Sequence, residues 1–86
     1  MKTIPISRRV WLEIDLSDSA TPALVVGRLG DDEIHTATWN CAVDTGCLGD
    51  NDDLVLDARE LAALEALEGE VDAAYASARA DDPEYQ

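Results

Sequence analysis

Acidic side chains crowd one segment in the middle of this sequence, and oxygen ligands of this kind can hold Ca²⁺. The segment contains Asp44, Asp50, Asp52 and Asp53. Their spacing does not fit an EF-hand, because no Gly stands at the sixth loop position and no Glu at the twelfth. A solvated acidic loop is the simpler interpretation, so we expect no calcium site.

A zinc site is the second chemistry that the residue types allow. His35, Cys41 and Cys47 could supply three ligands. The chain has no CxxC or HxxxH pair, however, and no evident fourth ligand. We therefore expect no metal and no other cofactor.

The tripeptide Asp44-Thr45-Gly46, preceded by Ala42-Val43, resembles the catalytic signature of retroviral-type aspartic proteases. Those proteins are small homodimers in which each subunit supplies one aspartate of a proton-sharing pair. The resemblance covers three residues only, and the flap hairpin and later apolar-apolar-Gly segment of that family have no counterpart here. The alternative is that Asp and Gly shape a turn after a strand.

No other catalytic arrangement is visible. The serines lie in no nucleophile motif, His35 is the single histidine, and no glycine-rich phosphate loop is present. The sequence therefore favours a binding protein over an enzyme.

The negative charge is concentrated in the second half of the chain. The net charge is -13 over 86 residues, of which residues 1–43 hold -2 and residues 44–86 hold -11. Such a field repels nucleic acid and anionic membranes and attracts basic surfaces. The alternative is that the charge only keeps a small protein in solution.

Targeting signals are not apparent. The N-terminal residues lack the apolar run of a signal peptide, and Ala23-Leu24-Val25-Val26 is far too short to span a membrane. We expect a cytoplasmic protein, inside a host cell if it is phage-encoded. In that compartment Cys41 and Cys47 should be free thiols, although Gly46 would allow them to join.

Hydrophobic patterning predicts a single α+β domain. Three antiparallel strands are expected within residues 8–43, at 9–16, 23–29 and 33–43. Residues 44–56 read as the acidic loop followed by a short apolar segment, Leu54-Val55-Leu56, which is either a fourth strand or a lead-in to a helix. Residues 81–86 read as a tail.

One long helix is expected over residues 57–80, packed on one face of the sheet. Asp57 and Glu60 have the spacing of a capping box, and Leu56 and Leu61 that of a hydrophobic staple. Apolar residues recur at helical spacing from Leu61 to Ala78, with Gly69 as a point where the helix could bend or fray.

On this helix, Glu65, Glu68 and Asp72 follow at spacings that place them on one side. Like charges at these spacings repel one another, and broken local rules often mark a functional surface. The same charge is extended by Glu70, Asp50, Asp52 and Asp53. The alternative is an ordinary solvated helix surface.

Trp11 alternates with Val10 and Leu12, so it belongs to the opposite face of its strand. If the helix covers the Leu12 face, Trp11 is exposed or lies in an interface, where Trp is a frequent binding hot spot. The alternative is that it packs locally against Val25 or Trp39.

The length, the low Lys content and the Ala/Glu/Leu-rich C-terminal helix, which ends in Asp81-Asp82-Pro83-Glu84-Tyr85, resemble small acidic phage or mobile-element inhibitors of the anti-CRISPR or anti-restriction type. The resemblance implies a protein that occludes the basic nucleic-acid surface of a defence complex. The alternative is a non-catalytic structural or accessory phage or bacterial protein that acts as a homodimer.

Overall fold

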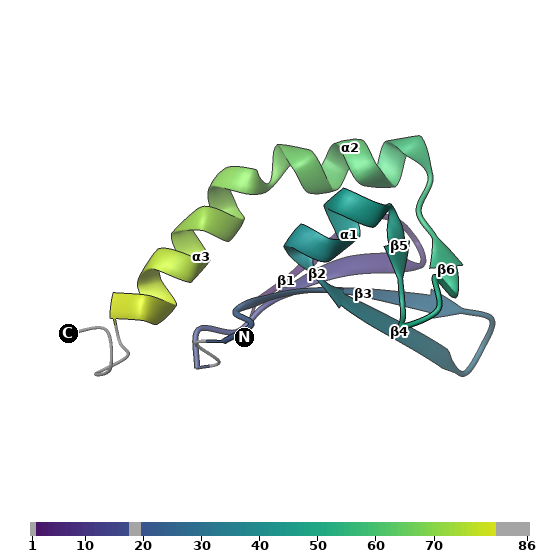
Figure 1. The fold of residues 1–86 in the computed structure, drawn as a ribbon, viewed down its shortest axis with the longest axis horizontal. Helices are drawn as coiled ribbons and strands as arrows, with labels where there is room; N and C mark the ends of the chain where they lie inside the picture. The colour runs from purple at the N-terminus through teal and green to yellow at the C-terminus, as the bar shows by residue number, and fades with distance from the viewer. Residues whose placement is uncertain (1, 18–19, 81–86) are drawn as a thin grey trace.

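A computed structural model describes residues 2–17 and 20–80, with side chains up to residue 78. Its main sheet has four antiparallel strands in sequence order (Figure 1). These strands are β1 (Lys2–Pro5), β2 (Val10–Ile14), β3 (Ala23–Leu29) and β4 (Glu33–Thr38). The predicted α+β class and antiparallel sheet are confirmed, but β1 was not predicted.

The alternating pattern of β2 explains how the sheet acquires a core face. Val10, Leu12 and Ile14 are buried, and Leu12 lies directly opposite Val25 of β3. Residues that face each other in the ladder project to the same side of a sheet. The helices and the small hairpin cover that side, and their Leu48, Leu54 and Leu64 complete the core cluster.

The third predicted strand ends earlier than expected, which corrects the range 33–43. Residues Trp39–Thr45 form a helix, α1. Thr38 caps its N-terminus by accepting a hydrogen bond from the Cys41 N–H, and Gly46 ends it in the left-handed conformation, at φ 72°. The Asp44-Thr45-Gly46 tripeptide is therefore the end of a helix in this fold.

The segment after α1 forms a second, two-stranded sheet instead of a fourth strand of the main one. Its strands are β5 (Cys47–Leu48) and β6 (Leu54–Val55). Gly27 of β3 makes room for this hairpin, because a Cβ there would lie 2.7 Å from a methyl carbon of Leu48 and of Leu54.

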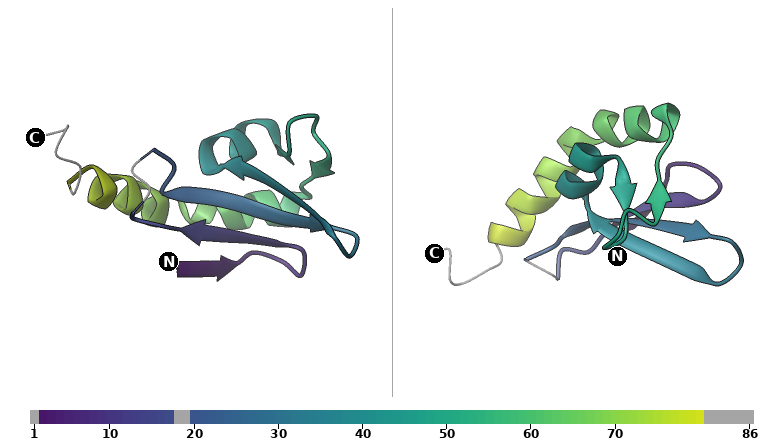
Figure 2. Two further views of the ribbon diagram at one scale, coloured as in Figure 1. Left: turned by 90° about the horizontal axis from the view of Figure 1, so that it is seen from below. Right: turned by 45° about the vertical axis from the view of Figure 1, so that its right-hand side comes forward.

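The single long helix predicted over residues 57–80 is wrong. The structure has two helices, α2 (Ala58–Ala66) and α3 (Glu68–Ala80), which meet at Leu67. In a continuous helix the Leu64 carbonyl would accept from the Glu68 N–H. Here it accepts from the Leu67 N–H at 3.1 Å and from the Trp39 indole N–H at 2.9 Å. This tertiary hydrogen bond accompanies the change of direction seen in Figure 2.

The elements form two layers. α1, α2 and the β5–β6 hairpin lie over one face of the sheet, and α3 continues beyond it (Figures 1 and 2). Within residues 2–17 and 20–80, no helix or hairpin covers the opposite face, which we call the open face.

Candidate partner-binding surface

The start of α2 is fixed by the predicted capping box. The Glu60 N–H donates to Asp57 Oδ1 at 2.8 Å, and the Asp57 N–H donates to Glu60 Oε1 at 2.9 Å. Leu56 is buried and Leu61 packs against the same core cluster, at the two positions of the predicted staple. Local sequence signals thus position the helix that carries part of the predicted acidic surface.

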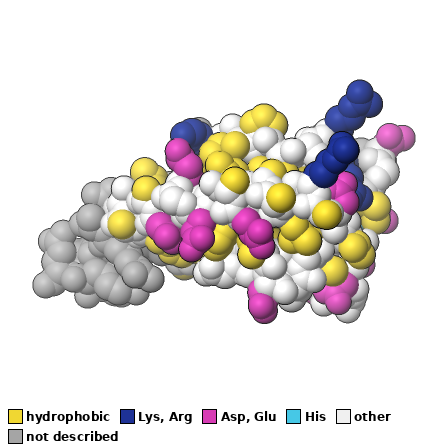
Figure 3. Space-filling model, turned by 90° about the horizontal axis from the view of Figure 1, so that it is seen from above, with side chains coloured by type: hydrophobic (Ala, Val, Ile, Leu, Met, Phe, Trp, Pro, Cys, Tyr) yellow, Lys and Arg dark blue, Asp and Glu magenta, His cyan; other side chains and the backbone are white. Residues whose placement is uncertain are grey.

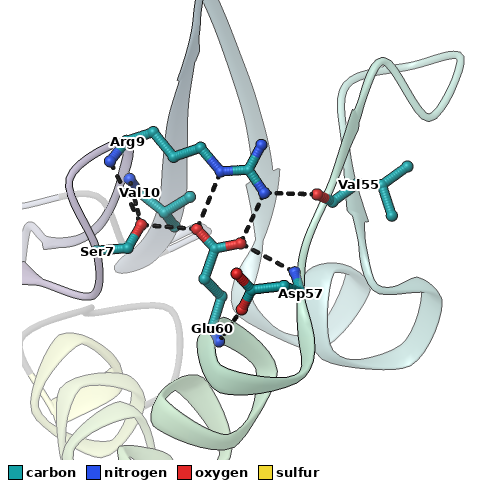
Figure 4. A network of polar contacts seen from close by, with 6 residues as sticks. All are labelled: Ser7, Arg9, Val10, Val55, Asp57 and Glu60. Atoms are coloured by element: carbon teal, nitrogen blue, oxygen red, sulfur yellow. Dashed lines mark hydrogen bonds and ion pairs between the residues drawn. The ribbon is translucent and has the colours of Figure 1, made fainter.

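Glu60 also receives a set of hydrogen bonds from the other end of the chain (Figure 4). Arg9 donates from Nη2 to Oε1 at 2.8 Å and from Nε to Oε2 at 3.1 Å. The Ser7 hydroxyl donates to Oε2 at 2.6 Å, and Arg9 Nη2 also donates to the Val55 carbonyl. We call Ser7, Arg9, Asp57 and Glu60 the anchor network.

The anchor network satisfies a buried charge. Glu60 is only 2% exposed. The hydrogen bonds from Arg9, together with those from Ser7 and the Asp57 backbone, lower the pKa of Glu60 to about 2 against the opposing effect of burial. The same pairing raises the pKa of Arg9. The bidentate ion pair between Arg9 and Glu60 therefore connects the residue before β2 to the first turn of α2.

The four predicted acids of the helix pair are all exposed, and three of them have no ion-pair partner in the described residues. Val71, Ala74 and Ala78 are the buried positions of α3, so Glu68 and Asp72, one turn apart, are left on the solvent side of this helix. Glu65 is exposed on the last turn of α2. We call Glu65, Glu68 and Asp72 the acidic row.

The space-filling view of this side shows a series of acidic side chains along the helices. The visible basic side chains lie outside this series, some of them beside other acidic side chains (Figure 3). No ion pair or side-chain hydrogen bond within the described residues involves any member of the acidic row. Their charge is therefore available to a partner.

Glu70 does not belong to the same group, although the sequence placed it there. Its carboxylate lies 3.6 Å from Lys2 Nζ of β1, and it lines a shallow groove with Ile14 and Leu16 between α3 and the sheet. Both side chains of the pair are more than half exposed, so the pair adds little to stability.

The predicted acids of the loop are separated from the helix acids. The loop joins β5 to β6 and lies against β4, whereas α3 extends from the other end of the molecule (Figure 1). Asp50 and Asp52 are exposed, and Asp53 lies 3.6 Å from His35 Nδ1. The predicted acidic residues thus form two groups and not one continuous patch.

The residues considered from sequence as metal ligands or as a protease aspartate do not come together in the described part of the chain. That part holds no group of three or more His, Cys, Asp or Glu side chains arranged to bind a metal. Cys41 and Cys47 are both free thiols. Asp44 is an exposed residue in the last turn of α1.

Trp11 lies on the open face, as its place in the alternation predicted. It is partly exposed and stands directly opposite Val26. The alternative, local packing of Trp11 against Val25 or Trp39, does not occur, because both of those residues belong to the core on the other side of the sheet. Its role in binding stays a prediction.

Sequence reasoning missed the nonlocal partners of this surface. Arg9 meets Glu60 and Trp39 meets Leu64 across long stretches of chain. The only local signal was the capping box, which drew attention to Glu60 but not to Arg9.

Comparison with known proteins adds no relative. No protein-family model matches the chain, and neither a curated protein nor a solved structure shows significant similarity to it. Within the described residues, no helix is long and apolar enough to cross a membrane.

Proposed function

We propose that the protein is an acidic inhibitor that binds a basic, nucleic-acid-binding surface of another protein complex, in the manner of anti-CRISPR or anti-restriction proteins. The acidic row occupies that surface and keeps nucleic acid away from it. The protein itself does not bind nucleic acid, because its charge has the same sign as the phosphates.

The observation that carries the proposal is that Glu65, Glu68 and Asp72 are exposed and have no ion-pair partner within the described residues, on helices that pack against the core. A row of carboxylates on a fixed backbone can meet arginines and lysines that otherwise contact phosphates. Because α2 is held by the anchor network and by Trp39, and α3 by the packing of Val71 and Ala74 in the core, little ordering is needed on binding, which favours affinity.

The test is capture of partners from a nuclease-treated bacterial lysate at low salt. The key variant carries Glu65→Lys, Glu68→Lys and Asp72→Lys. Its matched control carries Asp31→Lys, Asp32→Lys and Asp44→Lys, which change the net charge equally at exposed positions outside α2 and α3.

We expect the parent and the control to retain a nucleic-acid-binding protein that duplex DNA competes away, and the row variant to lose it by about tenfold or more. Raising the salt should release it from the parent. Equal loss in both variants would show only a general effect of charge and would contradict the proposal.

A further inference from the structure

The open face of the sheet has the composition of an interface. Trp11, Leu24, Val26 and Ile34 form an apolar strip along β2, β3 and β4, and Ile34 is 50% exposed. Around this strip lie polar side chains that the same ladder places on this face: Thr3, Glu13, Arg28 and Thr36. An apolar centre within a polar rim is typical of protein–protein contacts.

The burial of Val26 supports this assignment of faces. Val26 is 4% exposed, yet it does not belong to the core cluster. It must therefore be covered by neighbours on the open face, and Trp11 stands directly opposite it. The partly exposed indole of Trp11 thus lies at the centre of this face.

The two edges of the sheet are poorly suited to pairing with another strand. Pro5 in β1 has no N–H to donate, and Lys2 places a charge on the same short edge. On the other edge, the Gly49 N–H already donates to the Thr36 carbonyl of β4 at 3.2 Å. Association through the sheet is therefore left to its open face.

The charges on the open face are balanced and symmetrically placed. Glu13 lies two residues along the ladder to one side of the Trp11–Val26 row, and Arg28 lies two residues to the other side. The two rows are about 14 Å apart at the usual rise of a strand. Within the described residues, neither side chain has an ion-pair or hydrogen-bond partner.

We propose that the open face binds a second copy of this chain across a two-fold axis along the Trp11–Val26 row. This operation exchanges the rows on either side of the axis. The Glu13 row of each copy therefore faces the Arg28 row of the other, with the two side chains one strand, about 4.8 Å, apart across the sheet and within reach of each other. On a molecule of net charge -13, a face without net charge is where two copies repel each other least.

The size of the face sets the expected affinity. A four-stranded face about 19 Å wide and about 17 Å long offers about 300 Å² of flat area, well under the surface that stable dimers bury. The dimer should therefore be reversible, with a Kd of about 10 µM to about 100 µM.

Charge exchange provides a specific test by sedimentation equilibrium from about 2 µM to about 500 µM. The Glu13→Arg variant alone should place the introduced guanidinium against Arg28 of the other copy, and the Arg28→Glu variant alone should place two glutamates together. Each should dimerise about tenfold more weakly than the parent. An equimolar mixture should restore heterodimers to within about threefold of the parent, since both new contacts are then attractive.

Trp11→Ala should also weaken the dimer, and high salt should leave the parent dimer intact or strengthen it by screening the repulsion between the copies. A monomeric parent at the highest concentration would overturn the proposal, and so would a dimer that neither single variant weakens or that mixing does not restore. The inhibitor proposal fails separately, because the Glu65, Glu68 and Asp72 reversal leaves the open face unchanged.

Discussion

Two glutamates of the same helix illustrate two uses of negative charge in this molecule. Glu60 in the first turn of α2 is buried and accepts hydrogen bonds from Arg9, Ser7 and the Asp57 backbone. Glu65 in the last turn is exposed and has no basic partner in the described part of the chain. The residue type and the helix are the same, and only the surroundings differ.

The comparison separates charges that hold the fold from charges that the fold displays. A buried carboxylate is tolerated only when its oxygens are fully satisfied, as those of Glu60 are. Exposed acids such as Glu68 and Asp72 have no such requirement and gain nothing from each other. Their placement is thus better explained by a partner than by stability, and this view can be tested.

The largest expected effect on the free energy of unfolding comes from truncating Glu60, with the truncation of Glu65 as its comparison. Glu60→Ala removes half of the capping box and leaves Arg9 without its carboxylate, so we expect a loss of about 3 kcal/mol in the free energy of unfolding. Glu65→Ala should change it by less than about 0.5 kcal/mol. Urea denaturation of both variants measures the difference, and equal losses would contradict the assigned roles.

Acid should remove the stability that Glu60 contributes. Because the pKa of Glu60 is lowered from 4.5 to about 2, the unfolded state binds a proton first as the pH falls. The stability from this group is fully present above about pH 5 and is lost towards about pH 2.

The expected loss is about 2 kcal/mol, less than the full linkage value because the Arg9 partner is partly exposed. Glu60→Gln should flatten this part of the pH–stability curve. Urea denaturation at several pH values gives the curves. Parallel curves for parent and Glu60→Gln would show that Glu60 is not the group responsible.

Trp39→Phe tests the break at Leu67 between α2, which the anchor network holds, and α3, which carries Glu68 and Asp72. The change keeps an aromatic ring in the core but removes the N–H that donates to the Leu64 carbonyl. We expect a loss of about 1.5 kcal/mol from the hydrogen bond and the smaller ring. Amide exchange near Leu67 should also become faster, and unchanged exchange there would mean that the indole does not fix the joint.

The sequence was most informative where the determining interactions are local. The capping box at Asp57 and Glu60 and the alternation around Trp11 depend on neighbours a few residues away, and both were predicted. The helix α1 was missed because the β-branched and aromatic residues from Thr38 to Val43 favour a strand, whereas the cap at Thr38 and the left-handed Gly46 select a helix.

What could not be predicted depends on contacts between distant segments. The partner of Glu60 is Arg9, and the break between α2 and α3 involves the indole of Trp39. Neither pairing has a signature in spacing. For the candidate site, the sequence identified the acidic residues but not their division, because only the folded chain separates the β5–β6 loop from α3.

The smallest expected change in stability carries the most information about function. Asp72→Lys would pair Glu68 with an introduced lysine one turn later, at the spacing and orientation that stabilise helices, so it should raise the free energy of unfolding by about 0.3 kcal/mol at low salt. The gain should disappear at about 500 mM NaCl.

The same substitution, Asp72→Lys, should weaken binding to the basic partner. A variant that folds better and binds worse would show that the acidic row is kept for recognition at a small cost in stability. If instead binding were unchanged, Asp72 would be an ordinary solvated residue, and the proposed contact would have to rest on Glu65 and Glu68 alone.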